Sequence, residues 1–296
     1  MQKLKVFLLR WFYRWANKRA WSKIDLTALD SEDLSIPGSA GHIPARIYRP
    51  PGNSSNALII YMHGGGWVLG DLQTHDPFCR RLALECGATV VALDYRLAPE
   101  HPCPAAAIDC IDASKWLLAN QSALGLEQAS VFVAGDSTGA NLSAVVANHL
   151  CEQGDGGLTG QILIYPVVRH YAPYPVSYIE NGKGYGLTKN LMTWFWDTYL
   201  GGNSMASEGA VGPMATPLFE NLPATLPPAL VVTAGLDPLR DEGAQYAAKL
   251  DGAGIPCLHQ LFNSQMHGFV CSEGMTDGHV QAMQLISQWM VVQQQH

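Results

Sequence analysis

Three short segments of the chain carry residue types that together could perform nucleophilic catalysis. Residues 63–66 read HGGG, residues 135–139 read GDSTG around Ser137, and Asp237 and His267 follow towards the C-terminus. A serine hydroxyl, a basic histidine, an orienting carboxylate and a row of glycine amides are the groups that acyl transfer needs. The chain order serine, aspartate, histidine also differs from two other known layouts of such a triad. The segments therefore predict one hydrolytic site.

Ser137 lies where an apolar run gives way to a helical pattern. Residues 131–134 (VFVA) are typical of a buried strand, and residues 138 to about 151 are typical of a helix. A sharp turn between a strand and a helix needs small residues on both sides, and Gly135 and Gly139 supply them. A serine at the start of a helix is also a common N-cap. The strand–turn–helix context favours Ser137 as a nucleophile.

The glycine run is expected to bind a developing oxyanion. It follows the apolar residues 57–62 (ALIIYM), so it should reach the same edge of a parallel sheet as the serine. Because glycine has no Cβ, the amides of this run can turn inward. We expect the backbone amides of Gly65, Gly66 and Thr138 to form an oxyanion hole. His63 is expected to anchor the loop rather than to act as a base.

Asp237 and His267 complete the predicted triad. Each follows an apolar strand pattern, at residues 229–233 and 257–262, and catalytic residues collect on loops after strands in parallel sheets. His267 would take the proton of the serine and return it to the leaving group, while Asp237 fixes the tautomer of the imidazole. Other histidines fit the order less well, namely His75, His101 and His259. The rival acid, Asp241, is expected to open the next helix.

The wider pattern predicts an α/β fold with a mostly parallel central sheet and helices on both faces. Apolar strands alternate with helical segments over 296 residues, of which 48% are hydrophobic. Further strands are expected at 45–48, 88–93 and 161–165, and helices at 76–86, 105–118 and about 278–292. More than 60 residues separate 161–165 from the next strand, so an insertion lies between them. We expect residues 1–40 and 169–211 to form a helical cap over a catalytic domain made of 41–168 and 212–296.

The first 23 residues carry seven of the 18 Lys and Arg residues, and no acidic residue. Aromatic and aliphatic residues are interleaved with these charges, as in a basic amphipathic helix. Arginines interrupt any apolar run that could serve as a signal peptide. Packing over the protein itself, weak contact with a membrane surface and a cleaved segment all stay open. We expect a helix with an aromatic face over the pocket mouth (Phe7, Trp11, Trp15) and a basic face in solvent (Lys3, Arg10, Arg14, Lys18).

Composition narrows the partners and cofactors of the chain. A net charge of −7 argues against nucleic acid, which requires clustered positive charge. The chain has no HExxH motif and no P-loop, and the glycines at 64, 66 and 70 are spaced too widely for a dinucleotide fingerprint. Seven scattered cysteines without a C-x-x-C pair favour free thiols in a reducing cytoplasm. We expect no metal, no cofactor, no transmembrane helix and a cytoplasmic protein.

Five motifs in this order resemble those of the bacterial hormone-sensitive-lipase-like esterases, which have the α/β-hydrolase fold. They are HGGGW at 63–67, DYRLAPEHP at 94–102, GDS at 135–137, DPLRDE at 237–242 and HGF at 267–269. The resemblance covers roughly residues 40 to 290. It implies Ser137 as nucleophile, Asp237 and His267 as its partners, and a cap of N-terminal helices plus an insertion after the sixth strand. It also implies that residues 95–102 support the oxyanion turn.

The same resemblance implies a cofactor-free serine carboxylesterase that hydrolyses short- to medium-chain esters through an acyl-enzyme. Thr138 departs from the alanine that is usual there, and its β-branched side chain could narrow the acyl pocket. Ala140 likewise replaces the usual glycine. An amidase, lactonase or deacetylase with the same triad stays an alternative, as does a lipase that works at a membrane surface. The expected partner is a small-molecule ester, and a homodimer stays open.

Overall fold

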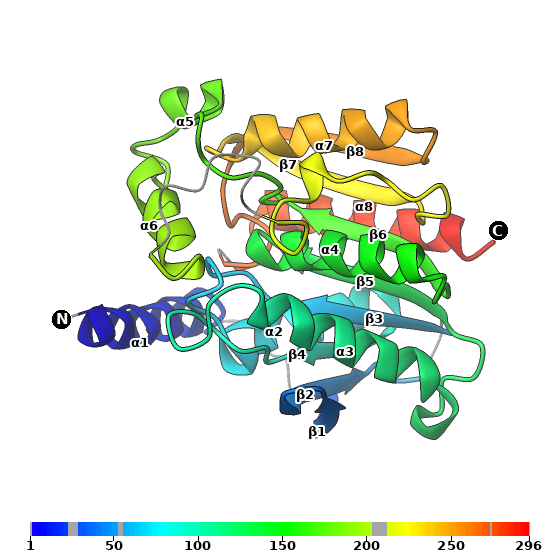
Figure 1. Ribbon diagram of the computed structural model, residues 1–296. Coiled ribbons are helices and arrows are strands. Elements are labelled where there is room, and N and C mark those ends of the chain that lie inside the picture. The colour runs from blue at the N-terminus through cyan, green and yellow to red at the C-terminus, as the bar shows by residue number, and fades with distance from the viewer. Residues whose placement is uncertain (1, 23–28, 53–55, 203–211, 273, 296) are drawn as a thin grey trace.

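The computed structural model describes residues 2–22, 29–52, 56–202, 212–272 and 274–295 (Figure 1). In these residues eight strands form one sheet in the order β1-β2-β4-β3-β5-β6-β7-β8. The strands are β1 (Asp30–Gly38), β2 (Gly41–Arg49), β3 (Ala57–Met62), β4 (Thr89–Leu93), β5 (Ser130–Asp136), β6 (Leu158–Ile164), β7 (Ala229–Leu236) and β8 (Cys257–Met266). Neighbouring strands in the run β4-β3-β5-β6-β7-β8 are parallel to one another. In contrast, β2 is antiparallel to β4, and β1 is antiparallel to β2. The predicted fold class is confirmed.

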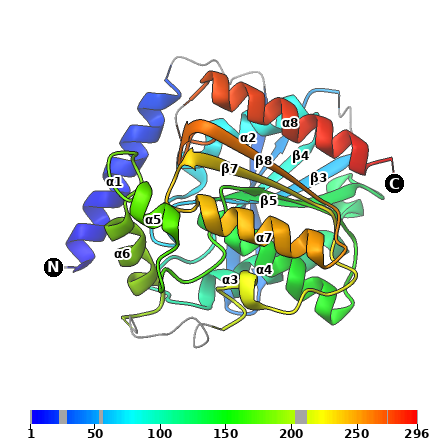
Figure 2. The ribbon, with the colours of Figure 1, turned by 90° about the horizontal axis from the view of Figure 1, so that it is seen from above.

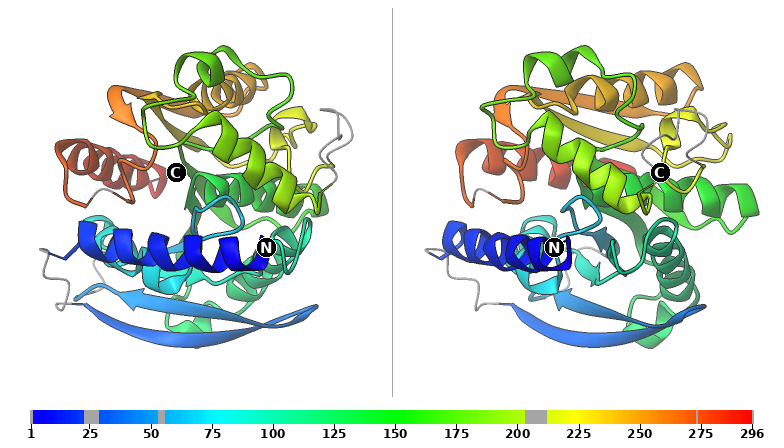
Figure 3. Two further views of the ribbon diagram at one scale, coloured as in Figure 1. Left: turned by 90° about the vertical axis from the view of Figure 1, so that its left-hand side faces the viewer. Right: turned by 60° about the vertical axis from the view of Figure 1, so that its left-hand side comes forward.

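Helices cover both faces of the sheet (Figure 2). One face carries α2 (Leu72–Cys86) and α8 (Asp277–Gln293), and the other carries α3 (Ala105–Ala119), α4 (Thr138–Gln153) and α7 (Arg240–Gly252). Three more helices gather at the end where the parallel strands finish (Figures 1 and 3): α1 (Gln2–Ala20), α5 (Val176–Glu180) and α6 (Lys189–Tyr199). Two short 3-10 turns complete the described part, η1 (Ser122–Leu124) and η2 (Pro217–Phe219).

The central strands are apolar throughout because both of their faces are covered. Every residue of β3 is buried, and its side chains alternate between the two sides of the sheet. Leu58 and Ile60 join the core cluster beneath α3 and α4, while Ile59 and Tyr61 join the one beneath α2 and α8. Parallel pairing with β4 on one side and with β5 on the other holds β3 in the middle of the sheet. It thereby fixes where the glycine run after β3 emerges from the sheet.

The sheet begins earlier in the chain than the pattern predicted. Strand β1 lies within residues 1–40, which we expected to belong to the cap, and it pairs antiparallel with β2. β1 is an edge strand with mostly exposed polar residues, so it has no apolar run that could have revealed it. The insertion 169–211 contains α5 and α6, and its residues 203–211 lie outside the described part, as do residues 23–28. The division into cap and catalytic domain stays a prediction.

The orientation that we predicted for α1 is wrong. Phe7, Trp11 and Trp15 are 66%, 61% and 49% exposed, so the aromatic face points to solvent instead of covering a pocket. Arg10 points inward and donates hydrogen bonds to the carbonyl oxygens of Val68 and Ala98. These carbonyl oxygens need hydrogen-bond donors, and a guanidinium offers several donors where an indole offers one. The inner face of α1 therefore suits arginine better than tryptophan. Arg14 also contacts the protein, through Asp71, and the side chain of Lys3 lies outside the described part.

The sharp turn around Ser137 depends on two glycines that let a helix approach the sheet. A Cβ on Gly139 would overlap the carbonyl oxygen of Met62 at the end of β3. A Cβ on Gly135 would overlap the backbone of Gly139 in the same way. Backbone atoms cannot move aside as the end of a flexible side chain can. The first turn of α4 is therefore held in direct contact with the strand that leads to the glycine run.

We expect Gly139→Ala to lower the free energy of unfolding by at least about 2 kcal/mol, because the added methyl group must displace backbone. Urea denaturation followed by circular dichroism measures this. Gly252→Ala is the matched control, since a Cβ on this last residue of α7 would meet open space. The control should change stability by less than about 1 kcal/mol. Equal stability of both variants would contradict the close approach.

Candidate active site

Ser137 occupies the turn between β5 and α4 in a backbone conformation that is rare for serine. Its φ is 55° and its ψ is −117°, outside the regions that L-residues usually adopt. The amide of Ser137 donates a hydrogen bond of 2.8 Å to the carbonyl oxygen of Ile164 on β6. Its carbonyl oxygen accepts from the amide of Asn141 in the first turn of α4. The turn is thus held from both sides, and its side chain is directed at the carboxyl ends of the strands.

The structure brings Ser137, His267 and Asp237 together although long stretches of chain separate them. The distance from His267 Nε2 to Ser137 Oγ is 3.0 Å, and that from His267 Nδ1 to Asp237 Oδ2 is 2.7 Å. Asp237 is fully buried, while the side chain of His267 is 12% exposed. The ring of Tyr165 packs against the imidazole with 4.6 Å between ring centroids. A buried carboxylate, an imidazole and a hydroxyl therefore form one continuous hydrogen-bonded row.

The loop that carries Asp237 is held by the insertion between β6 and β7. Within the loop, the amide of Leu239 donates to Asp237 Oδ1 over 2.9 Å. Asn181 follows α5, and its side-chain amide donates to the carbonyl oxygens of Gly235 and Asp237. Ser177 Oγ in α5 donates to the carbonyl oxygen of Pro238 over 2.5 Å. The insertion is thus a brace for the acidic member of the row.

The glycine run lies beside the start of α4. Gly65 and Gly66 have φ values of 122° and 68°, which only glycine adopts without strain, and Leu69 donates its amide to the carbonyl oxygen of Gly65. Thr138 is the first residue of α4, where a helix leaves amides without intrahelical partners. The hydroxyl of Thr138 accepts a hydrogen bond of 3.3 Å from the amide of Trp67. The side chain of Thr138 therefore connects the start of α4 to the residue that follows the glycine run.

An aromatic residue of α6 packs directly on the glycine run. A Cβ on Gly66 would overlap the ring of Phe195, so the ring lies against the Gly66 backbone. Phe195 is only 5% exposed and belongs to the same core cluster as Trp67 and Trp196. The aromatic pattern at 191–200 does not distinguish which ring reaches the site. Only the position of α6 over the loop identifies Phe195.

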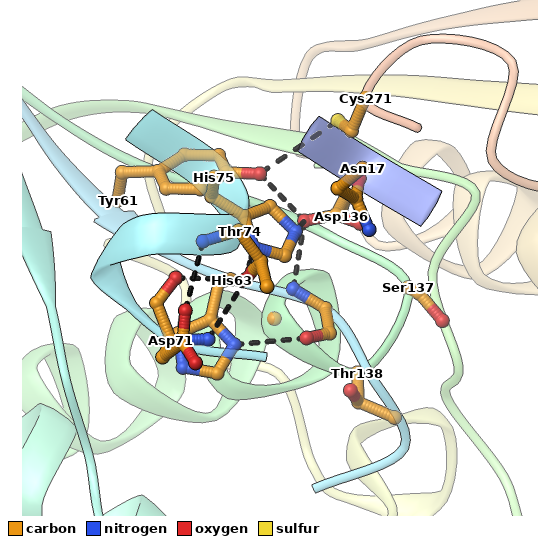
Figure 4. A network of polar contacts seen from close by, with 12 residues as sticks. Asn17, Tyr61, His63, Asp71, Thr74, His75, Asp136, Ser137, Thr138 and Cys271 are labelled. Atoms are coloured by element: carbon orange, nitrogen blue, oxygen red, sulfur yellow. Dashed lines mark hydrogen bonds and ion pairs between the residues drawn. The ribbon is translucent and has the colours of Figure 1, made fainter. Parts of the chain in front are cut away.

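A buried polar network behind the serine ties the glycine run to the turn (Figure 4). Asp136 Oδ1 accepts hydrogen bonds from the amide of Gly64 over 2.7 Å and from the hydroxyl of Tyr61 over 2.5 Å. His75 Nε2 lies 3.5 Å from the same carboxylate oxygen. Burial alone would raise the pKa of Asp136, but neighbouring His75 and the hydrogen bonds lower it below its ordinary value. Asp136 is therefore a buried carboxylate that holds the first amide of the glycine run.

The histidine of the glycine run has a structural position, as its sequence context predicts. His63 Nδ1 lies 2.8 Å from the carbonyl oxygen of Gly64, and its ring stacks on Tyr95 with 4.3 Å between centroids. The hydroxyl of Tyr95 donates to the carbonyl oxygen of His63 over 2.6 Å. Burial and the neighbouring His75 lower the pKa of His63 to about 4. A neutral, stacked imidazole anchors the loop.

The network contains residues that sequence reasoning missed. His75 is one of the rival histidines named above, but it lies buried in α2 against Asp136. Asp136 is part of GDSTG, and only its place directly before the serine could have drawn attention to it. The other rivals lie elsewhere: His259 contacts Thr233 on β7, and Asp241 lies in the first turn of α7. Contacts over dozens of residues cannot be read from local spacing.

Helix α1 contacts the loops on both sides of the site. Arg10 Nε donates to the carbonyl oxygen of Val68, just after the glycine run, over 2.8 Å. Just beyond the C-terminal end of α1, Trp21 Nε1 donates a hydrogen bond of 3.2 Å to the carbonyl oxygen of Cys271, which follows His267 by four residues. Arg10 also pairs with Glu100 in the segment 95–102. The N-terminal segment therefore braces the loops with its polar and inward-facing side chains.

The described part of the chain has neither a metal cluster nor a membrane span. Among those residues, no three His, Cys, Asp or Glu side chains are grouped so that they could hold a metal ion. None of the helices in the described ranges combines the length and the apolarity needed to cross a bilayer.

We expect Asp136→Asn to lower kcat by about ten- to a hundredfold with a smaller change in KM. The substitution weakens the hold on Gly64, and a displaced glycine run harms the transition state more than substrate binding. Steady-state kinetics with a nitrophenyl acetate ester measure the split. The matched control is Asp155→Asn, which removes an exposed carboxylate paired with Lys115 and should leave both constants within about twofold.

The acid dependence of stability gives a second readout for the same variant. A carboxyl whose pKa is lowered on folding stabilises the native state above its ordinary pKa of 3.8, and this contribution is lost as the pH falls below that value. Asp136→Asn should therefore be destabilised near neutral pH and lose less further stability on acidification than the unaltered protein. An unchanged kcat together with an unchanged acid limb would contradict the role of Asp136.

Known proteins resemble this chain in sequence over most of its length. A family model described as alpha/beta hydrolase fold matches residues 59–271. The carboxylic ester hydrolase LipN of Mycobacterium tuberculosis is 42% identical over 247 residues, which are 82% of this chain and 65% of LipN. The esterase LipI of the same organism is 40% identical over 253 residues, which are 84% of this chain and 78% of LipI.

A solved structure extends the similarity to nearly the whole chain. The esterase of Pyrobaculum calidifontis superposes with a TM-score of 0.88 at 40% identity, covering 96% of this chain and 91% of that one. The TM-score over nearly the whole chain agrees with the sheet described above. The chain belongs to the α/β-hydrolase fold family, in its group of hormone-sensitive-lipase-like carboxylic ester hydrolases.

Proposed function

We propose that this protein is a serine carboxylesterase that hydrolyses short- to medium-chain esters through an acyl-enzyme. The observation that carries the proposal is the hydrogen-bonded row from Asp237 through His267 to Ser137, with heavy-atom distances of 2.7 and 3.0 Å. Both distances are within the reach that proton transfer requires. The row ends beside the glycine run, where backbone amides can receive negative charge.

Acylation uses each of these groups once. Ser137 Oγ attacks the acyl carbon of the ester while His267 Nε2 takes the hydroxyl proton. The carbonyl oxygen becomes an oxyanion, and the amides of Gly65, Gly66 and Thr138 are the proposed donors to it. The imidazolium then gives its proton to the departing alkoxide, which leaves as the alcohol. The acyl group remains on Ser137 as an ester.

Deacylation repeats the sequence with water as the nucleophile. His267 takes a proton from a water molecule, whose oxygen attacks the acyl carbon on Ser137. The tetrahedral intermediate collapses when Ser137 Oγ leaves and recovers the proton from the imidazolium. The products are the free acid and the original enzyme, so the cycle needs no cofactor. The same amides serve both tetrahedral intermediates.

The surroundings of the triad favour the charge separation that these steps need. Asp237 is fully buried and accepts the amide of Leu239, so it can stay fixed while the imidazolium forms beside it. Loss of one oxyanion donor typically costs about 2.7–4 kcal/mol of transition-state stabilisation. The bonds that fix the glycine run, through Asp136 and Thr138, therefore bear directly on the rate.

Helix α6 supports a preference for small substrates. Phe195 lies against Gly66, and Ser137 is only 7% exposed, so the described part of the chain largely screens the nucleophile from solvent. An aromatic wall next to the oxyanion site suits an apolar acyl or alcohol group of limited size. A small-molecule ester is the substrate class that we propose.

Ser137→Ala should lower kcat for a nitrophenyl acetate ester by at least about a thousandfold, because no other group in the row can attack the acyl carbon. Circular dichroism should show an intact fold. The matched control is Ser287→Ala, which removes a serine hydroxyl of α8 that donates to the backbone carbonyl oxygen of Glu85 and should leave kcat unchanged. Activity retained in Ser137→Ala would remove this residue from the mechanism. A matching amide cleaved as fast as the ester would favour an amidase.

Phe195→Ala should shift the chain-length preference towards longer esters. Removing the ring opens space beside Gly66, so the ratio of kcat/KM for an octanoate to that for an acetate ester should rise by about tenfold. The control is Phe219→Ala, which truncates a 45%-exposed ring on η2. A series of nitrophenyl esters of increasing acyl length provides the measurement. An identical profile in both variants would show that α6 does not shape the pocket.

A further inference from the structure

Helix α1 presents a continuous apolar stripe to solvent. Six large side chains on it are between 49% and 66% exposed: Leu4, Phe7, Leu8, Trp11, Phe12 and Trp15. Their spacing of three and four residues places them on one face of the helix. Soluble monomers rarely expose large apolar residues as one contiguous patch. The stripe therefore needs a partner that covers it.

The exposure of this stripe does not result from incomplete packing of α1 on the core. The opposite face of α1 is already packed, with Val6 and Asn17 buried and Tyr13 against the apolar core. Arg10 and Arg14 fix the helix to the loop carbonyls and to Asp71. These contacts leave the helix no freedom to turn its stripe inward. The exposed face is a property of the folded protein.

Cations flank the stripe. Lys18 and Arg19 are exposed near the end of α1, and Arg19 lies over the ring of Trp15. Two further cations of the helix contact the protein, because Lys5 lies over the ring of Trp194 and Arg14 pairs with Asp71. The sequence has no acidic residue before Asp25, although the whole chain has a net charge of −7. A patch that combines tryptophan and phenylalanine with lysine and arginine matches the chemistry of an anionic lipid surface. Aromatic rings enter the headgroup region, and the cations face the lipid phosphates.

We propose that the outer face of α1 docks the protein on anionic membrane surfaces. A second copy of the chain fits this face less well, because two basic stripes brought together would repel each other. An anionic bilayer offers an apolar phase and opposite charge at once. The helix would lie in the plane of the interface, with its inner face still packed on the protein.

Docking through α1 would bring the catalytic end of the molecule to the lipid. Figure 3 shows α1 together with α6 at the end where the parallel strands finish. Val6 on the inner face of α1 belongs to the same core cluster as Trp67 and Phe195. Trp67 directly follows the glycine run, and the ring of Phe195 contacts it at Gly66. Esters that partition into the bilayer would then meet the site without crossing bulk water. The docking itself does not depend on the proposed esterase activity.

Sedimentation of the full chain with lipid vesicles tests the proposal. The protein should bind vesicles of phosphatidylglycerol and phosphatidylcholine, bind weakly to pure phosphatidylcholine, and be released as salt is raised. Neutralising two cations in Lys18→Gln with Arg19→Gln should weaken the partition coefficient by about thirtyfold. Phe7→Ser with Trp11→Ser should abolish binding while hydrolysis of a water-soluble ester stays unchanged.

A matched control comes from the opposite end of the molecule. Val291 and Val292 of α8 are 51% and 50% exposed, so Val291→Ser with Val292→Ser removes two exposed apolar side chains without touching α1. This control should bind vesicles like the unaltered protein. Absence of binding to anionic vesicles, or equal binding by the stripe and control variants, would overturn the proposal. Light scattering that shows a dimer dissociated by Phe7→Ser with Trp11→Ser, without vesicle binding, would assign the face to a second copy instead.

Discussion

The hydrogen bond from the Gly64 amide to the buried carboxylate of Asp136 is the interaction on which the site depends. Asp136 directly precedes Ser137, so one side chain connects the strand-to-helix turn with the glycine run after β3. The contact of Gly139 with the Met62 carbonyl brings the same two segments together through backbone atoms. Nucleophile and oxyanion donors thereby share one frame, and such preorganisation is what electrostatic catalysis requires.

The two helical additions to the sheet act as braces for the catalytic loops. Helix α1 reaches the loop after the glycine run through Arg10, and Trp21 just beyond it reaches the loop after His267. Helix α5 reaches the loop of Asp237 through Ser177. Each brace bonds to a backbone carbonyl rather than to a catalytic side chain. The residues that do chemistry thus remain free to exchange protons while the backbone that carries them is fixed.

Local pattern was sufficient for the central part of the molecule and insufficient for its periphery. Strands such as β3, β5 and β7 are buried on both faces, so their apolar runs identify them, and the segments after β5 and β7 carry Ser137 and Asp237 to one edge. His267 reaches the same edge from β8, whose residues are exposed or half-buried. Strand β1 could not be predicted from an apolar run, because this exposed edge strand consists mostly of polar residues. The facing of α1 could not be predicted, because it depends on carbonyl oxygens of Val68 and Ala98 that only the fold brings under the helix.

The central claim is that the frame around Ser137 holds it for covalent catalysis. The most direct test is mass spectrometry of the enzyme quenched during turnover of a nitrophenyl butyrate ester, followed by peptide mapping. We predict one butyryl group per chain, located on Ser137, which disappears as the substrate is consumed. No covalent adduct during steady turnover, or a butyryl group on any other residue, would contradict this mechanism.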